Sequence, residues 1–319
     1  MRRLLFLLLT LASATAALAQ PFPTRPITMI VPYAAGGSAD VVARPLAAEM
    51  SKVLGENVVV ELRPGAGGNI GAEYVARSAR GDGYTILLAS LSLATNMSLM
   101  KLNFDPRKDL VAIGGICTFP NVLVVSSQDP ARTLKDIVAR ARAEPGKLTY
   151  GSSGPGTSSH LAGELLSAAA NIQLVHIPYK GSGAVYPDLI ARRVTMLFDL
   201  SGSASGHIKG GQVKALATTG AKRAAALPDI PTFAESGFPG FEFGAWLGLF
   251  APNETPKEAL ARLEQAMLEA INTPDMKSRL AQMGGEPIPA RAAEFWKFFN
   301  DDVERYARLV REGKVQPIN

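Results

Sequence analysis

The sequence predicts an α/β protein whose chain forms two units with a cleft between them. Segments typical of buried strands alternate with segments typical of amphipathic helices, once near residues 27–90 and again near residues 122–220. A long apolar segment at 241–252 then precedes further helical segments, which indicates that the chain returns to the first unit. Because ligands bind preferentially at domain interfaces, we expect the binding site between the two units.

The first unit begins with the apolar segment ITMIV. Its strands are predicted at 27–31, 57–62 and 84–90. A helix is predicted over 38–55, with one apolar face made by Val42, Leu46, Met50 and Val53, and a short helix over 72–78. Pro45 lies inside the longer helix, where a proline removes a hydrogen bond, so the helix is expected to begin just before Pro45 or to kink there.

The same apolar periodicity predicts the elements of the second unit and of the C-terminal tail. Strands are predicted at 122–126, 148–152, 172–179, 194–199 and 213–220. Helices are predicted at 133–145 and 158–170, and in the tail near 256–271, 274–283 and 290–312. The helix over 158–170 has Leu161, Leu165 and Leu166 on one face, which is expected to pack on the sheet.

The N-terminal segment has the pattern of a secretory signal peptide. Two arginines precede an apolar run from Leu4 to Leu9, and small residues lead to Ala19. A membrane anchor is the alternative, but the apolar run is shorter than the ~20 residues that span a bilayer. We therefore expect export with cleavage after Ala19, which removes residues 1–19 and leaves a soluble mature chain.

Charge and cysteine content exclude several classes of function. Loss of Arg2 and Arg3 with the signal lowers the formal net charge from +5 to +3, and no basic run is present. This argues against nucleic acid and mildly favours anionic ligands. Cys117 is the only cysteine, so no intramolecular disulfide or thiolate metal cluster is expected, and its apolar surroundings indicate a core position rather than a nucleophile.

Two glycine-rich turns are the most informative pattern. PYAAGGSAD (32–40) joins the first strand to a helix, and GSSGPGTSSH (151–160) does the same in the second unit. Such turns direct backbone N–H groups outward beside a helix start, where anions bind. Phosphate is the competing anion, but neither G-x-x-x-x-G-K-[ST] nor G-x-G-x-x-G after a strand is present. For either turn taken singly, glycines that only shape the chain remain the alternative.

Charged and titratable residues are few in these loops. They are Asp40, His160, Lys180 and Asp199. Asp40 either caps its helix or accepts a hydrogen bond from the ligand, and His160 either bonds its own loop or contacts the ligand. Lys180 is either solvated or the one nearby positive charge. Asp199 ends a strand that faces the expected cleft, and the sequence favours neither ligand contact nor a structural role for it.

Hydrolytic chemistry finds little support in the sequence. No G-x-S-x-G motif is present, and His160, His176 and His207 lack metal-ligand spacing. Ser158, His160 and Asp199 could be combined on paper as a triad, but residues two apart on a helix point to different faces. His176 is expected to be structural, and His207 to cap a surface turn. Tyr33 and Trp246 are cleft walls or ordinary core residues.

The chain resembles the Bug-type periplasmic receptors of tripartite tricarboxylate transporters over essentially the whole mature sequence. The similar stretches, in the same order, are 22–44, 58–90, 148–166, 175–199 and 213–243, and they include IVPYAAGGSAD, RPGAGGNIGAEYVA and LTYGSSGPGTSSHLAGELL. Within ARRVTMLFD, Arg193 and Thr195 stand where the family is expected to have a glycine and an acid. Those positions lie away from the cleft.

This resemblance implies a two-lobed periplasmic binding protein fold of the second type. The lobes are expected at 21–122 plus 229–319 and at 123–228, joined by two crossing strands near 114–125 and 241–252 that act as the hinge. The resemblance implies these ligand-binding residues: Tyr33, Ala35, Gly37, Ser38, Asp40, Ser90, Asn96, Ser153, Gly156, Thr157, His160, Lys180 and Asp199.

The implied function is a monomeric, non-enzymatic receptor. It would capture a small organic carboxylate without metal or organic cofactor and deliver it to a membrane permease. The identity of the carboxylate does not follow from the resemblance. An adaptor that reports ligand to a signalling partner is the alternative, and a secreted hydrolase is a weaker one.

Overall fold

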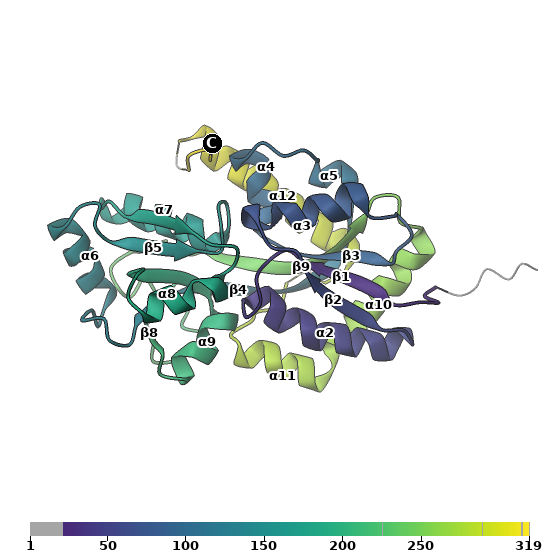
Figure 1. Ribbon diagram of the computed structural model, residues 1–319, viewed down its shortest axis with the longest axis horizontal. Helices are drawn as coiled ribbons and strands as arrows, with labels where there is room; N and C mark the ends of the chain where they lie inside the picture. The colour runs from purple at the N-terminus through teal and green to yellow at the C-terminus, as the bar shows by residue number, and fades with distance from the viewer. Residues whose placement is uncertain (1–21, 225, 289, 314, 319) are drawn as a thin grey trace, which may run out of the picture.

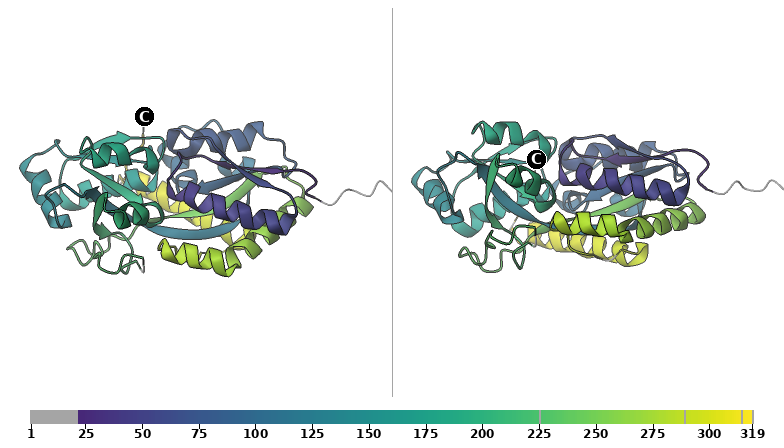
Figure 2. Two further views of the ribbon diagram at one scale, coloured as in Figure 1. Left: turned by 60° about the horizontal axis from the view of Figure 1, so that its bottom comes forward. Right: turned by 90° about the horizontal axis from the view of Figure 1, so that it is seen from below.

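The computed structural model describes residues 22–224, 226–288, 290–313 and 315–318, and the predicted signal peptide lies outside these ranges. The molecule is elongated, with two lobes side by side (Figure 1). The beginning and the end of the chain share one lobe, and the middle of the chain forms the other. Views from below show the same division (Figure 2). The predicted α/β class and two-lobed architecture are confirmed.

One sheet runs through both lobes. In the described chain it has nine strands in the order β2-β1-β3-β9-β4-β7-β5-β6, with β8 also paired to β4. The strands are β1 (Ile27–Val31), β2 (Val58–Leu62), β3 (Thr85–Ser90), β4 (Leu110–Ser126), β5 (Thr149–Ser152), β6 (Val175–Pro178), β7 (Met196–Leu200), β8 (Val213–Thr218) and β9 (Gly244–Pro252). β1, β2 and β3 are mutually parallel, as are β5, β6 and β7, so the carboxyl ends of each set meet at one edge.

Strand β4 belongs to both lobes. Its first part, Leu110–Pro120, pairs antiparallel with β9, and from Asn121 onward it pairs with β7 and, from Val122, with β8. The apolar pattern predicted this strand only over 122–126, twelve residues short at its start, whereas the family resemblance implied a crossing strand near 114–125. Two register shifts, between Ala112 and Gly114 and between Gly115 and Cys117, allow the glycine-containing segment to remain in the sheet. β4 and β9 are thus the two long strands at the predicted crossing.

The helices cover both faces of the sheet. They are α2 (Ser38–Leu54), α3 (Asn69–Glu73), α4 (Ser92–Leu99), α5 (Pro106–Asp109), α6 (Leu134–Ala143), α7 (Ser158–Ala170), α8 (Tyr186–Ile190), α9 (Ser201–Lys209), α10 (Lys257–Asn272), α11 (Pro274–Gln282) and α12 (Ala292–Arg311). The predicted short helix over 72–78 is present but begins earlier, because α3 continues directly into the π-helical turn η2 (Tyr74–Ser78), and the turn η1 (Ala66–Gly68) precedes it.

Helix α2 runs without interruption through Pro45. The helix therefore begins seven residues before the proline rather than next to it. Pro45 is half-buried between the exposed Val41 and Arg44, so water can satisfy the carbonyl group that the proline leaves unpaired. The helix ends at Gly55, whose φ of 76° closes the last turn through a bond to the Ser51 carbonyl.

Two apolar clusters hold the first lobe together on opposite faces of its sheet. One packs α2, α10 and α11 against β1, and it includes Cys117, where burial raises the pKa of the thiol. The other packs α4 and α12 against the opposite face. In it Trp246 lies edge-on to Phe295 at 5.4 Å between ring centroids, and its indole N–H donates to Asp302 at 2.8 Å. Trp246 is thus a core residue.

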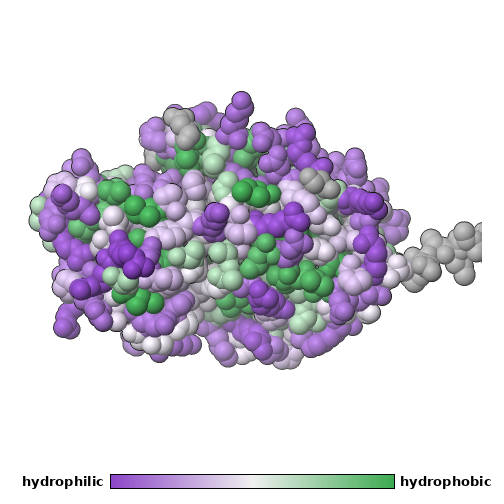
Figure 3. Space-filling view, in the orientation of Figure 1, coloured by the Kyte–Doolittle hydropathy of each residue, from purple (hydrophilic) through white to green (hydrophobic). Residues whose placement is uncertain are grey.

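The face shown in Figure 3 is largely hydrophilic, with small separate apolar patches. Over the part of the chain that the structure describes, no helix is both long and apolar enough to cross a bilayer. The same residues contain no cluster of histidine, cysteine or acidic side chains suited to a metal ion.

Candidate functional site

A small cavity of ≈ 40 Å³ lies between the two lobes. Its walls come from the turn before α2, the end of β3, β4, the turn before α7, η3 (Ser182–Ala184), the end of β7 and β9. The lining residues are Tyr33, Gly37, Ser38, Ala39, Ser90, Asn121, Ser153, Thr157, Ser158, Ser159, Ser182, Asp199, Leu200 and Leu247. Both predicted glycine-rich turns therefore contribute to one cavity.

Three helices begin at this cavity. α2 starts after Gly37, α7 after Thr157 and α9 after Leu200, and each of these residues lines the cavity. Among the described residues, no N-cap side chain bonds any of these three helices, although the Ser203 N–H in the first turn of α9 donates to Ser38 Oγ. The first backbone N–H groups of a helix lack intrahelical partners, and the helix dipole makes this end positive. The arrangement can hold an anion, although none of the lining side chains is basic.

Seven of the predicted site residues line the cavity. They are Tyr33, Gly37, Ser38, Ser90, Ser153, Thr157 and Asp199. The hydroxyl of Tyr33 lies 2.6 Å from Ser92 Oγ, and burial raises the pKa of Tyr33 to about 12, so its side chain is a neutral hydrogen-bonding group. Ser153 is fixed through its backbone N–H, which donates to Ser159 Oγ at 2.8 Å.

Asp199 is the buried acid of the cavity. Tyr186 donates to its carboxylate at 2.7 Å, Ser203 donates to the same oxygen, and the Leu200 N–H donates to the other at 2.9 Å. Burial raises the pKa of Asp199, and these donors act in the opposite direction. Because both of its oxygens already accept hydrogen bonds, Asp199 shapes the β7 side of the cavity.

Asp40 holds the turn that precedes α2 and is absent from the cavity lining. Its carboxylate accepts a hydrogen bond from the Gly36 N–H at 3.0 Å and forms an ion pair with Arg44 at 2.8 Å. Asp40 therefore holds the turn before the helix and caps none of the N–H groups of α2. Direct ligand contact by Asp40 stays a prediction.

His160 has a similar role in the second turn. Its Nδ1 accepts from the Gly156 N–H at 3.2 Å, and its ring lies on His176 at 4.2 Å between centroids. His176 in turn lies 2.6 Å from Ser152 Oγ through its Nε2. Burial lowers the pKa of both rings, to about 4 for His176, so both are neutral near pH 7. His160 is thus placed to shape its loop.

The remaining predicted residues lie at the seam between the lobes or at the surface. Ala35 and Lys180 are exposed, and the Lys180 carbonyl accepts from the Ala34 N–H at 3.0 Å. Asn96 is fully buried beside Gly156, and its Nδ2 donates to Asn69 at 2.9 Å. These residues help the two lobes fit together. A local sequence pattern cannot distinguish a residue with this role from one that contacts the ligand.

The seam itself is tightly closed. Across it, Thr95 Oγ1 donates to the Gly156 carbonyl at 2.6 Å. A Cβ added to Gly67 would lie 2.0 Å from the Pro155 carbonyl oxygen, and one added to Gly183 would lie 2.0 Å from the Ala35 carbonyl oxygen. Glycine at these positions therefore lets backbone from one lobe approach backbone from the other on two sides of the cavity.

The structure does not assemble Ser158, His160 and Asp199 into a triad. Ser158 Oγ donates to Asn121 at 3.4 Å, His160 Nδ1 accepts from the Gly156 N–H, and Asp199 accepts from Tyr186 and Ser203. Each of the three has a partner outside the set. His207, in the last turn of α9, stacks on Tyr186 at 3.5 Å between ring centroids, and its Nδ1 lies 2.7 Å from Gln212 Oε1 beyond the helix end.

Sequence reasoning missed half of the cavity wall. The residues not predicted are Ala39, Asn121, Ser158, Ser159, Ser182, Leu200 and Leu247. Ser158 and Ser159 adjoin a predicted residue and begin a helix, which is a usable local signal. Asn121 is the one polar side chain within FPNVLVV, and a polar group in a buried strand requires a partner. Leu247 carries no such signal.

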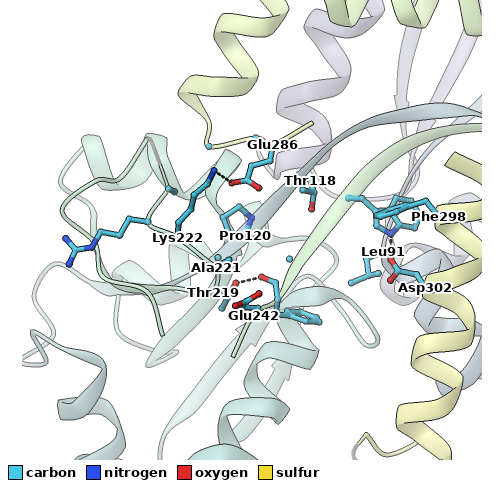
Figure 4. A pocket seen from close by; sticks show the side chains of 18 of the residues that line it. Leu91, Thr118, Pro120, Thr219, Ala221, Lys222, Glu242, Glu286, Phe298 and Asp302 are labelled. Carbon is cyan, nitrogen blue, oxygen red and sulfur yellow. Dashed lines mark hydrogen bonds and ion pairs between the residues drawn. The ribbon is translucent and has the colours of Figure 1, made fainter. Parts of the chain in front are cut away.

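A larger cavity of ≈ 740 Å³ lies on the other side of the crossing strands (Figure 4). Side chains of neighbouring residues on a strand point to opposite faces, and here Pro120 and Trp246 line the larger cavity whereas Asn121 and Leu247 line the smaller one. An ion pair of 3.7 Å between Lys222 and Glu286 crosses the larger cavity. Leu91, the residue before α4, also lines the larger cavity, whereas the residues before α2, α7 and α9 all line the smaller one.

The fold and the smaller cavity define a two-lobed solute-binding protein. Residues 42–315 match the family described as tripartite tricarboxylate transporter family receptor, and the chain belongs to this family. Receptors of this family bind solutes in the periplasm. BugT of Bordetella pertussis is 36% identical over 307 residues, which are 94% of each chain.

Solved structures agree with this assignment. The periplasmic binding protein BugD superposes with a TM-score of 0.89 at 36% identity, covering 93% of this chain and 100% of that one. MatC from Rhodopseudomonas palustris, solved with bound malate, superposes with a TM-score of 0.84 at 30% identity, covering 91% of this chain and 100% of that one. The resemblance seen in the sequence is therefore confirmed.

Proposed function

We propose that this protein captures a small organic carboxylate in the cavity between its lobes and delivers it to a membrane permease of the tripartite tricarboxylate type. The convergence of helix starts from both lobes on one cavity carries this proposal. Charge-assisted hydrogen bonds are worth about 1.5–3 kcal/mol each, so a few backbone N–H groups suffice without a basic side chain. The malate bound by MatC supports the same ligand class.

We expect the lobes to close because the ligand contacts both of them. The proposed lobes are residues 21–122 with 229–319, and residues 123–228, with β4 and β9 as the hinge. A ligand that contacts α2 in one lobe and α7 and α9 in the other binds the closed arrangement more tightly than the open one, and thereby shifts the population toward closure. The permease would then read the closed form.

We propose an exported, monomeric receptor, processed after Ala19, that acts without metal or organic cofactor and does not transform its ligand. The proposed ligand contacts are the cavity residues. The other predicted residues shape the loops around them, and these are Ala35, Asp40, Asn96, Gly156, His160 and Lys180.

A screen of carboxylic acids by thermal shift tests the proposal. A ligand present at 100 times its dissociation constant adds ~2.7 kcal/mol of stability, which is readily measured. Malate, succinate, adipate and benzoate are suitable probes, with the corresponding amides or alcohols as controls. We expect one or more acids to stabilise the protein and the neutral analogues to have no effect. Stabilisation by neutral sugars alone would reject a carboxylate receptor.

Transport is tested separately from binding. Deletion of the receptor gene should abolish uptake of the radiolabelled acid identified in the screen, and a plasmid copy should restore it. Unchanged uptake together with loss of acid-dependent gene expression would instead identify a sensing role.

A further inference from the structure

Asn121 occupies a fixed position at the centre of the molecule. It is 0% exposed and lies where β4 changes from pairing with β9 to pairing with β7. Its N–H donates to Thr219 Oγ1 at 2.9 Å, and its carbonyl accepts from the Thr219 N–H at 2.8 Å. Both backbone groups of Asn121 are therefore held by Thr219, the residue after β8.

The side-chain amide of Asn121 is only half satisfied. Its Oδ1 accepts from Ser158 Oγ, at 3.4 Å, in the first turn of α7. Its Nδ2 is buried and has no hydrogen-bond partner among the residues that the structure describes. An unpaired buried donor is destabilising, and such groups are uncommon in folded proteins. Asn121 also lines the small cavity, beside Thr157 and Ser158.

We propose that Asn121 Nδ2 donates a hydrogen bond to an oxygen of the bound carboxylate. This inference rests on the proposed function and adds a side-chain donor to the backbone donors of α2, α7 and α9. The contact with Ser158 orients the amide so that its donor end remains available. Since Asn121 lies on a crossing strand, it meets the ligand at the hinge and fixes how deep the carboxylate sits between the lobes.

Variants of Asn121 can separate the effect of this residue on stability from its effect on ligand binding. Asn121→Leu removes the C=O and NH₂ groups of the amide and keeps a similar volume. It therefore removes the destabilising unpaired donor together with the contact to the ligand. Asn121→Asp keeps the shape and replaces the donor by a negatively charged acceptor. Thr118→Val is the matched control, because Thr118 lies on the same strand but lines the larger cavity on the opposite side.

The experiment combines calorimetry with thermal melts, using the tightest-binding acid from the screen. We expect Asn121→Leu to bind roughly 10- to 150-fold more weakly, as for loss of one charge-assisted bond, with an apo melting temperature equal to or above that of wild type. Asn121→Asp should bind more weakly still, and Thr118→Val should bind like wild type.

Two results would overturn the assignment. One is carboxylate affinity in folded Asn121→Leu and Asn121→Asp proteins within threefold of wild type. The other is a lower apo melting temperature with unchanged affinity, which would identify Asn121 as a purely structural residue or a ligand of a buried water. If Asn121→Leu does not fold, the isosteric Asn121→Asp variant decides the question. Absence of carboxylate binding by the wild type would reject the proposed function itself.

Discussion

Ser38 and Ser203 join the two lobes through a reciprocal pair of hydrogen bonds. Ser38 Oγ accepts from the Ser203 N–H at 3.0 Å and donates to Ser203 Oγ at 3.1 Å. Ser203 Oγ donates in turn to the buried Asp199. The start of α2 in one lobe is therefore linked through α9 to the acid of the cavity in the other, so that closure and the polarity of the cavity depend on the same chain of contacts.

Replacement of Ser38 by alanine should weaken ligand binding. Each neutral hydrogen bond contributes about 1 kcal/mol, so loss of the pair should reduce affinity roughly 5- to 30-fold. Ser205→Ala is the control, because Ser205 Oγ bonds within α9 to the Gly202 carbonyl. Titration calorimetry measures the effect. Equal affinities for the Ser38 and Ser205 variants would show that the interlobe pair does not contribute to closure.

Gly156→Ala should block closure at the seam. Gly156 has a φ of 71°, which disfavours a side chain, and an added Cβ would lie 1.6 Å from Asn96 Oδ1. Gly206→Ala is the matched control, since nothing lies within 4 Å of the added Cβ. We expect the Gly156 variant to lose ligand-induced compaction in small-angle scattering. Adding Asn96→Ala should restore part of it, and compaction of the single variant equal to wild type would refute the clash.

A bulky residue at Gly37 should abolish binding without unfolding the protein. The backbone φ of −77° is compatible with a side chain, but an added Cβ meets Ser182 Oγ at 3.2 Å across the cavity. Gly37→Leu therefore fills the anion site, whereas Gly37→Ala adds a single methyl group and should retain part of the affinity. The apo melting temperature and ligand titration are measured together. Normal affinity in a folded Gly37→Leu protein would place the ligand elsewhere.

Acidification should reduce the stability of the fold through His160 and His176. Burial lowers the pKa of both rings below the ordinary histidine value of 6.5, and that of His176 falls to about 4. The unfolded chain then binds more protons than the native one between pH 6.5 and 4, so stability is lost as the pH falls through this range. Apo melting temperatures of wild type and His176→Gln across that range test the sign, and the variant should show a smaller slope. A melting temperature that rises on acidification would contradict the histidine account.

The sequence was most informative where function depends on local structure. Gly37 and Thr157 each precede a helix at the end of a strand, and the order strand, glycine turn, helix is readable from neighbouring residues. Their convergence required only the rule that parallel strands end at one edge of a sheet. The roles of Asp40 and His160 stayed open because capping a turn and contacting a ligand use the same residue types.

Contacts between distant parts of the chain could not be predicted from the sequence. Asn121 faces the cavity because β4 continues from one lobe into the other, and the glycine-containing half of β4 did not resemble a strand. Asn96 meets Gly156 only when the lobes are together. Pairing of this kind depends on how distant segments pack, and neither periodicity nor a turn motif encodes it.

The most direct measurement is titration calorimetry of the mature wild-type protein with the acid that ranks first in the screen, beside its neutral amide. We predict binding at a ratio of one acid per chain, with no detectable heat from the amide. Equal binding of the acid and its amide would show that uncharged peptide donors at the helix starts do not recognise a negative charge, and would contradict the account.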